Sequence, residues 1–228
     1  DVDSGLIIHH DVTNEANDSQ LLHPMSMATM EVLEVDELKV LADGGYSNAQ
    51  AVAQCERDHI EVAAPIKRGA MSTDFFRPAQ FVYDEETDTI RCPAGKTLRP
   101  SGKHTRNRAI RYRTSACKDC RLKSRCTSGA QRTIHRLFDQ AALDRMEARI
   151  YADPSLMVTR RCTVEHPFGT ITRMSGGGRF LTRGLRAVKA EAALSIVAFN
   201  ILHAVNAFGA ERLSQRGEAR VAVLAAAD

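Results

Sequence analysis

Two carboxylates stand in short motifs whose residue types could bind a metal ion. Asp43 lies in the segment Ala42–Tyr46, and Glu165 lies in the segment Thr163–Ile171. Carboxylate oxygens are the hard ligands that Mg²⁺ and Mn²⁺ prefer, and such ions keep coordination positions for water and phosphate. The structural alternative is that Asp43 caps the next helix and that Glu165 pairs with Arg161, for about 0.2–0.5 kcal/mol. The metal-site hypothesis therefore requires folding to bring residues 43 and 165 together.

A second group of candidate ligands is a set of cysteines. Four of the six cysteines could close a tetrahedral Zn²⁺ site, and they are Cys92, Cys117, Cys120 and Cys126. The pair spaced as CxxC is the strong part of this signal, whereas the other two are spaced irregularly. His104 or His135 could replace one ligand, and the alternative is four reduced thiols that bind nothing. Cys55 and Cys162 are expected in the core.

The cysteines lie within a strongly basic stretch. Residues 91–136 contain 14 Lys and Arg but only one acid, Asp119, whereas residues 1–60 contain 12 Asp and Glu against 2 Lys and Arg. A dense set of cations favours a polyanionic partner, because neutralising phosphates releases condensed counterions. Tyr112 is the only aromatic residue in the densest part, so contact with a duplex backbone is favoured over base stacking. Two ordinary solvated faces are the alternative.

Turn residues, capping residues and the hydrophobic pattern indicate the elements that must position Asp43. Leu38–Ala42 is typical of a short strand, and Ser47 is a candidate N-cap for a helix that ends near Arg57. Ile60–Ile66 is typical of a second buried strand. A strand, helix and strand in this order predict a parallel pair, with Asp43 at the carboxyl end of the first strand.

The remaining elements are less sharply marked. Gly5–Thr13 is expected to be a strand, Ser19–Leu33 a helix, and Ile134–Ala152 another helix. Leu185–Phe208 is expected to be a long helix. Its uncharged part, Ala192–Gly209, is short for a membrane span and carries a polar stripe, so a buried core helix is the favoured interpretation.

Composition limits the class of protein. The chain has 228 residues and is 43% hydrophobic, which is enough to bury a substantial core. It lacks the pattern of a signal peptide, and its cysteines occur without secretory features. A cytoplasmic protein in a reducing compartment is therefore expected, without a membrane partner.

The two acidic motifs, in this order, resemble the second and third acids of the DDE transposases of bacterial insertion sequences. The resemblance covers about residues 1–209 and includes four further segments, namely Val12–Glu15, Asp18–Leu21, Cys92–Gly95 and Ala198–Asn200. In that family the third acid lies in a signature of Tyr, two residues, Arg, three residues, Glu, six residues and Lys. Arg161 and Glu165 match this spacing, but Val158 and Thr172 replace the Tyr and the Lys. Arg173 is the expected substitute for that phosphate contact.

The resemblance implies a function. Asp43 and Glu165 would be catalytic and would bind Mg²⁺ or Mn²⁺, which activate the attacking oxygen and stabilise the leaving one during DNA cleavage and strand transfer. The implied partner is double-stranded DNA, both element ends and target, bound by a possible homodimer. The residues expected to contact DNA are Arg161, Arg173, Lys103, Arg106, Arg108, Arg111 and Arg113.

The family's first acid normally lies on an upstream strand, so it is expected to be missing from this chain. Asp1, Asp3 and Asp11 are the available substitutes, and without a first acid the fragment should not cleave DNA. Two alternatives stay open. One is a DNA-binding remnant of a transposase without catalysis, and the other is an RNase H-like nuclease that hydrolyses without joining strands.

The predicted fold class is α/β, an RNase H-like mixed sheet flanked by helices and interrupted by a basic, Cys-rich insertion. The expected parts are a first part of the core at residues 1–68, the insertion with its possible zinc site at 69–133, a C-terminal helical part at 134–209, and an Ala-rich tail at 210–228.

Overall fold

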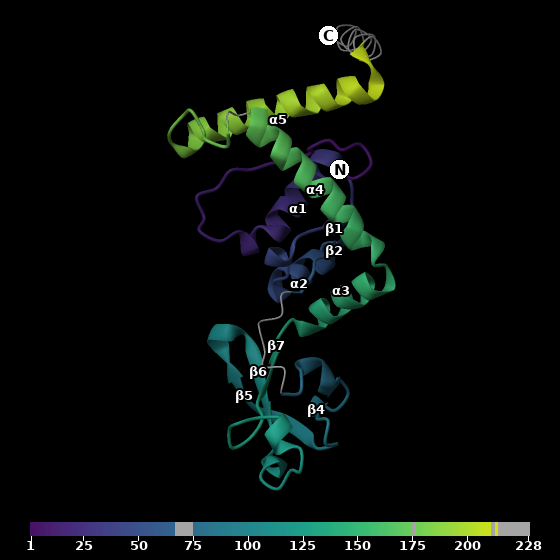
Figure 1. Cartoon of the computed structure of the whole chain (residues 1–228), viewed down its shortest axis with the longest axis vertical. Coiled ribbons are helices and arrows are strands. Elements are labelled where there is room, and N and C mark those ends of the chain that lie inside the picture. The colour runs from purple at the N-terminus through teal and green to yellow at the C-terminus, as the bar shows by residue number, and fades with distance from the viewer. Residues whose placement is uncertain (67–74, 175–176, 211–212, 214–228) are drawn as a thin grey trace.

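The computed structural model describes residues 1–66, 75–174, 177–210 and 213, without the side chains of residues 164–166. These residues form a mixed α/β structure with two separate sheets (Figure 1). Its α-helices are α1 (Leu22–Leu33), α2 (Ala49–Arg57), α3 (Gln140–Ala152), α4 (Ser155–Met174) and α5 (Leu185–Phe208). Residues 69–74 of the expected insertion, and nearly all of the expected tail at 210–228, lie outside the described residues.

The first sheet is a parallel pair, as the sequence predicted. Strand β1 (Leu38–Leu41) pairs with β2 (Ile60–Ala63), with Leu38 opposite Ile60, and α2 makes the crossover between them. The predicted cap at Ser47 is wrong by one residue. The side chain of Asn48 caps α2 by accepting hydrogen bonds from two backbone N–H groups, while the Ser47 hydroxyl donates to a carbonyl in the preceding turn.

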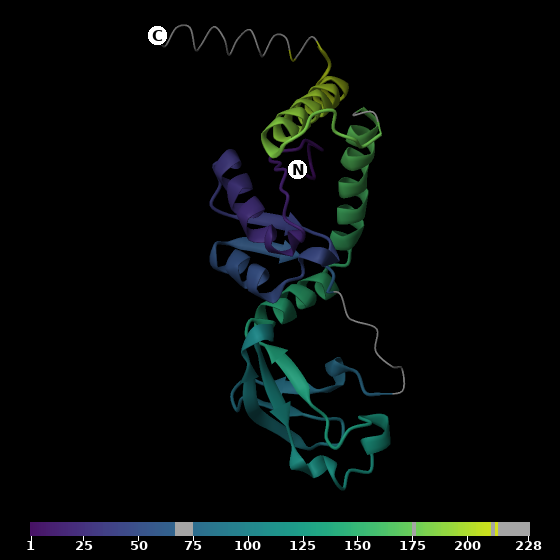
Figure 2. The same cartoon turned by 90° about the vertical axis from the view of Figure 1, so that its left-hand side faces the viewer.

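Three helices cover this pair of strands. Val52 of α2, Val62 of β2 and Met146 of α3 are each fully buried, and Leu22 of α1 joins the same core cluster. The helix α3 lies between the parallel pair and the second sheet (Figure 2). The strand that carries Asp43 is therefore held against a packed apolar layer, which fixes the backbone that leads into the site.

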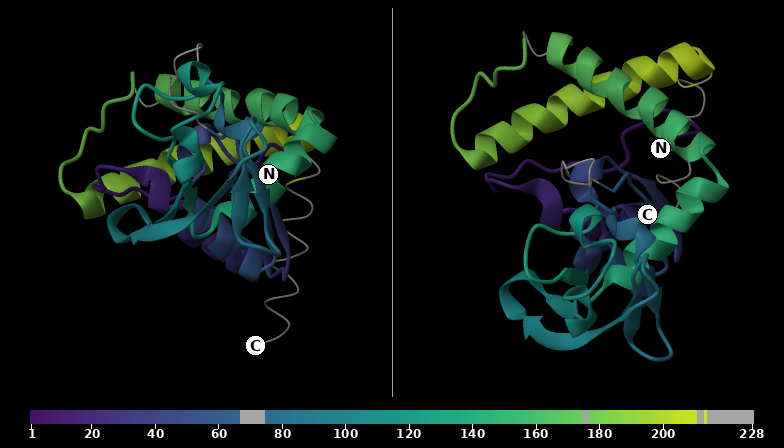
Figure 3. Two further views of the ribbon diagram at one scale, coloured as in Figure 1. Left: turned by 90° about the horizontal axis from the view of Figure 1, so that it is seen from below. Right: turned by 60° about the horizontal axis from the view of Figure 1, so that its bottom comes forward.

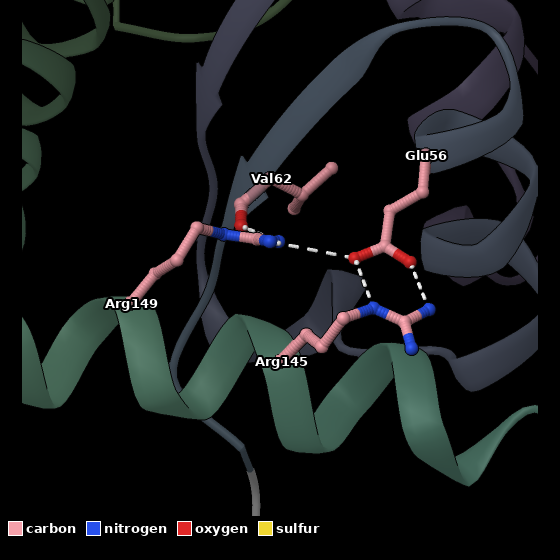
Figure 4. A network of polar contacts seen from close by, with 4 residues as sticks. All are labelled: Glu56, Val62, Arg145 and Arg149. Atoms are coloured by element: carbon pink, nitrogen blue, oxygen red, sulfur yellow. Dashed lines mark hydrogen bonds and ion pairs between the residues drawn. The ribbon is translucent and has the colours of Figure 1, made fainter.

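A charged network joins α3 to the first sheet (Figure 4). Glu56 of α2 accepts hydrogen bonds from Arg145 at 2.6 Å and 3.4 Å and from Arg149 at 3.4 Å. Arg149 also donates to the carbonyl of Val62 at 3.0 Å. Because the side chain of Glu56 is only 19% exposed, these contacts are partly shielded from solvent.

The second sheet is an antiparallel meander of five strands. They are β3 (Val82–Asp84), β4 (Thr89–Arg91), β5 (Thr97–His104), β6 (Ala109–Arg113) and β7 (Ile134–Leu137), in that order across the sheet. Its small core contains Phe81, Ile90, Leu98 and Tyr112, all buried. The sheet is thus built around few large side chains, and much of its surface is polar.

The strand β7 corrects one expectation. A helix was predicted over the whole of Ile134–Ala152, but the first four residues pair with β6 and the helix begins only at Gln140. The physical reason is the alternation of faces, since Ile134 packs against the apolar cluster while the side chain of His135 is exposed on the other face.

Two further expectations are wrong at the opposite end of the molecule. Gly5–Thr13 forms no strand, because its backbone meets a side chain rather than a neighbouring strand: Asn200 of α5 bonds both the N–H and the carbonyl of Ile7. The expected buried core helix is exposed, since Phe199 is the only buried residue of α5 and Leu194 is 72% exposed. The helix crosses near α4 (Figure 3) and, by length and composition alone, could span a membrane.

Candidate functional site

Asp43 lies where the sequence predicted, directly beyond the carboxyl end of β1. Its carboxylate accepts a hydrogen bond from the backbone N–H of Gly45 and so caps the short 3-10 turn η2 (Gly44–Tyr46). Half of its side chain is nevertheless exposed. Capping the turn and binding a metal ion are therefore compatible roles for Asp43, because a carboxylate that caps a turn still presents oxygen lone pairs to solvent.

The helix α4 passes this position and contacts β1. The guanidinium of Arg160 lies 4.0 Å from a carboxylate oxygen of Asp43. Sequence reasoning did not single out Arg160. A second nitrogen of the same guanidinium, Nε, is buried and has no hydrogen-bond partner among the described residues. The side chain is thus partly withdrawn from water, so its attraction to Asp43 is stronger than that of a fully exposed pair.

Glu165 belongs to the same helix, five residues after Arg160. At 1.5 Å of rise per residue its backbone lies about 7.5 Å farther along the axis. Its side chain lies outside the described residues, so the meeting of the two acids stays a prediction. Arg161 is exposed beside Arg160, and Arg173 is exposed in the last turn of the helix.

A carboxylate that the sequence analysis assigned no role also lies in this neighbourhood. Asp18, in the 3-10 turn η1 (Asp18–Gln20), lies close enough to Tyr46 to influence the pKa of its hydroxyl. Burial is the first cause that raises the pKa of the Tyr46 phenol, followed by its interaction with Asp18 and by the charge of Asp43. Tyr46 therefore stays neutral and links the two acidic turns. The signal that could have found it is the segment Asp18–Leu21, which was recognised only as part of a resemblance.

Two of the proposed substitutes for a first acid are engaged elsewhere. Asp1 accepts a hydrogen bond from the backbone of Ser4, and Asp11 pairs with Lys189 of α5 at 2.6 Å. The side-chain bond from Lys189 lowers the pKa of the exposed Asp11 carboxyl. Neither contact joins these acids to Asp43.

Five of the seven predicted DNA-contacting residues lie on the second sheet or in its β5–β6 turn. Arg111 and Arg113 project from the same face of β6, opposite to the buried Tyr112, and neither has an ion pair with a carboxylate in the described chain. Arg106 is exposed in the adjoining β5–β6 turn, and Lys103 is exposed near the end of β5, opposite Ile110 and thus on the other face of the sheet. Arg108 differs, because it is paired with Asp139 at 3.1 Å and stacks over Phe138.

Histidines extend this cationic face. His135 is opposite Arg111 in the register of β6 and β7, and its ring lies 6.3 Å from that of His104. Although the side chain of His135 is largely exposed, partial shielding of its ring from water is the largest cause that lowers the pKa of His135, followed by the charges of His104, Arg111 and Arg113. We call the face formed by Arg99, His104, Arg111, Arg113 and His135 the cationic sheet face.

The four candidate zinc ligands lie close together, but they do not form a complete coordination site. Cys92, Cys117, Cys120 and Cys126 all line one cavity of about 20 Å³. Burial raises the pKa of the Cys126 thiol, and the other three thiols are close enough to influence it. Within the described chain, however, no three Cys, His, Asp or Glu side chains are arranged to hold a metal ion. The predicted zinc coordination is therefore not formed by the thiols as they lie.

These features define a mixed α/β protein with an exposed carboxylate at a strand end, a helix with an Arg-x3-Glu motif beside it, and a cationic sheet. The family model described as "Transposase DDE domain" matches residues 91–205, half of the chain. The chain therefore belongs to the DDE transposase family. No curated protein and no solved structure matched it. The matched range includes Glu165, strands β5 to β7 and all four clustered cysteines.

Family membership has two coarse consequences. The substrate class is DNA, and domains of this family generally use divalent metal ions. The matched range begins within β4 and continues into α5. The basic antiparallel sheet is thus covered by the same family model as the helix that carries Glu165.

Proposed function

We propose that Asp43 and Glu165 are two acids of a transposase active site built on an RNase H-like core. The observation that carries this proposal is the contact between Arg160 and Asp43, because it brings α4, the helix with the family's Arg-x3-Glu motif, to the carboxyl end of β1. The parallel β1–α2–β2 unit supports the core assignment, since functional groups of such sheets gather at the carboxyl ends of strands.

The donor chemistry at Asp43 fits Mg²⁺ or Mn²⁺. One carboxylate oxygen accepts from Gly45 and the other lies 4.0 Å from Arg160, so both oxygens keep a free lone pair on a half-exposed group. Asp43 and Glu165 would hold the metal, and the bound ions would activate the attacking oxygen and stabilise the leaving one. Arg160 offsets part of the negative charge of Asp43 and leaves both of its oxygens accessible.

The proposed reaction has two steps. Water attacks a phosphodiester at the element end, and the freed 3′-hydroxyl then attacks a phosphodiester of the target DNA. Neither step needs a covalent enzyme intermediate. The protein's own task is to hold the two DNA segments with their reacting atoms in line, because positioning supplies much of the rate in such displacements. A homodimer on two DNA ends would meet this requirement.

The proposed grip on DNA is the cationic sheet face together with Lys103 and Arg106. Arg111 and Arg113 lack carboxylate partners in the described part of the chain, so their charges remain available for phosphates. Arg161 and Arg173, both exposed on α4, would contact phosphate nearer to the acids. Arg108 is expected to contribute least, because Asp139 already neutralises it.

The test uses Asp43→Asn and Glu165→Gln in the native full-length protein. Each substitution removes a carboxylate charge at nearly constant volume, so cleavage of a DNA end with Mn²⁺ should fall by at least about 100-fold while DNA binding persists. Glu61→Gln is the matched control, because Glu61 is an exposed carboxylate on the neighbouring strand β2. Retained cleavage in Asp43→Asn or Glu165→Gln would remove that residue from the site.

The products of the same assay separate the competing functions. A transposase yields strand-transfer product with target DNA. Nicking without joined product favours a nuclease, and tight DNA binding with neither product from the unaltered protein favours a non-catalytic remnant.

A further inference from the structure

The longest irregular stretch of the second sheet connects β6 to β7. Residues 114–133 contain only two 3-10 turns, η5 (Ser115–Cys117) and η6 (Lys123–Arg125), and none of them is buried. A connection of this length without regular structure or apolar burial needs another source of order, because little hydrophobic free energy holds it. The stretch lies at the end of the molecule farthest from α5 (Figure 1).

Polar contacts hold one side of this connection. The N–H of Phe76 donates to the carbonyl of Arg125 at 2.9 Å, and Arg132 donates to the carbonyl of Cys126 at 3.0 Å. The guanidinium of Arg125 also stacks over the Phe76 ring. These contacts order the neighbourhood of Cys126, but they do not reach the turn that contains Cys117 and Cys120.

The four clustered thiols are the remaining groups that could order this connection, because they lie close together. Three separate turns bring them together: the N–H of Gly95 closes a turn on the carbonyl of Cys92, the N–H of Cys120 closes one on Cys117, and Cys126 ends η6. All four side chains line one cavity of about 20 Å³. A space of this size accepts one ion or one water, since about 10–15 Å³ suffices for a single probe sphere.

The charges around the cavity fit a bound anionic cluster. Its lining includes Lys96, Lys123 and Arg132 but no Asp or Glu. One Zn²⁺ with four thiolates carries a net charge of about −2, which the two lysines would offset. Arg132 is already held by the carbonyls of Cys126 and Phe76. Soft sulfur ligands select zinc over the Mg²⁺ or Mn²⁺ of the carboxylate site.

We propose that Cys92, Cys117, Cys120 and Cys126 bind one structural Zn²⁺ that orders the β6–β7 connection. The ion is held when the thiols turn inward about their Cα–Cβ bonds, each releasing its proton to solvent as its sulfur ligates the metal. The structure excludes the two histidines that the sequence left open as ligands. His104 and His135 pair with each other on the cationic sheet face and do not line the cavity.

The first test is the metal content of the full chain purified without chelator. We expect about one zinc per chain, with the four clustered thiols protected from a thiol reagent until a strong chelator is added. Exposed Cys162 supplies the internal reference, because it should react at once in either condition. A folded, metal-free protein whose clustered thiols react as fast as Cys162 overturns the proposal.

Variants sharpen the assignment. Cys117→Ser with Cys120→Ser should lose the zinc, and Cys162→Ser should keep it. If the double variant fails to fold, Co²⁺ substitution in the unaltered chain replaces it, and thiolate-to-cobalt absorption with tetrahedral d–d bands is expected. Absence of those bands in cobalt-loaded protein counts against the site. The outcome is independent of the proposed catalysis, because Asp43→Asn should retain its zinc in full.

Discussion

At the scale of single residues, the carboxylate of Glu56 joins helix α2 to helix α3. Among the described residues it is the only carboxylate bonded to both Arg145 and Arg149, and the buried Nε of Arg149 has no partner there. Removing Glu56 would leave Arg149 partly buried and uncompensated. Glu56→Ala should therefore lower the free energy of unfolding by about 1–3 kcal/mol, measured by urea denaturation.

The matched control is Arg145→Ala, which breaks the shorter of the contacts. The side chain of Arg145 is 60% exposed, so water replaces much of what the ion pair provided and the loss should stay below about 1 kcal/mol. Equal losses in Glu56→Ala and Arg145→Ala would show that the burial of Arg149 has no energetic consequence.

At the scale of elements, the helices and strands that depend on short sequence patterns were predicted correctly. The parallel β1–α2–β2 unit follows from two short apolar runs, a polar turn and a helix cap, and the structure confirms each run within a few residues. The cap itself was misassigned to Ser47. Ser47 and Asn48 are both good capping residues, and only the backbone geometry of the turn decides that Asn48 accepts the two N–H bonds.

Elements that depend on distant partners were not predictable in this way. The two apolar residues of Ile134–Leu137 are three positions apart, which is helix spacing, but pairing with β6 makes the segment a strand. Gly5–Thr13 has the composition of a strand, but the polar side chain of Asn200 takes the backbone groups that a neighbouring strand would need. In both cases the deciding contact is far away in the sequence.

The cationic sheet face gives a prediction about pH. The pKa of His135 is lowered by partial shielding from water and by the charges of His104, Arg111 and Arg113, so His135 is largely neutral near pH 7 in the free protein. DNA phosphates bound at this face would offset the charges of those cations and raise the pKa of His135. DNA binding should therefore be coupled to the uptake of a proton by His135. DNA affinity should then rise as pH falls from about 8 to 6, by at most about tenfold per unit for one proton.

Fluorescence anisotropy at constant ionic strength measures this dependence. His135→Gln should flatten the pH profile, whereas His23→Gln should leave it unchanged, because His23 pairs with Asp58 beside α1 and α2. An unaltered profile in His135→Gln would place the bound DNA away from this face.

At the scale of the whole molecule, the candidate site depends on the path of α4 past the carboxyl end of β1. The resemblance named Asp43 and Glu165, but no local pattern showed that Arg160 contacts Asp43 or that Asp18 reaches Tyr46. Both contacts join segments that are distant in the chain, so tertiary packing alone produces them. The likeness to known transposases named the two proposed acids, and the fold shows which residues lie beside Asp43.

The N-terminal segment lies against α5. Asn200 accepts from the Ile7 N–H at 2.9 Å and donates to the Ile7 carbonyl at 2.8 Å. Gly5 passes close by with a φ of +66°, and a Cβ there would meet the ring of His203. The segment is therefore fixed by one amide side chain and by a close approach that only glycine permits.

Asn200→Ala should release this segment while leaving the α-helical content intact. Each lost hydrogen bond is worth about 0.5–1.5 kcal/mol, so amide exchange at Ile7 should accelerate by roughly 5- to 100-fold. Asn206→Ala is the control, since Asn206 is exposed on the same helix and makes no such bond to Ile7. Hydrogen-exchange mass spectrometry of the first ten residues measures both variants. Equal protection in the two would mean that α5 does not hold the N-terminal segment.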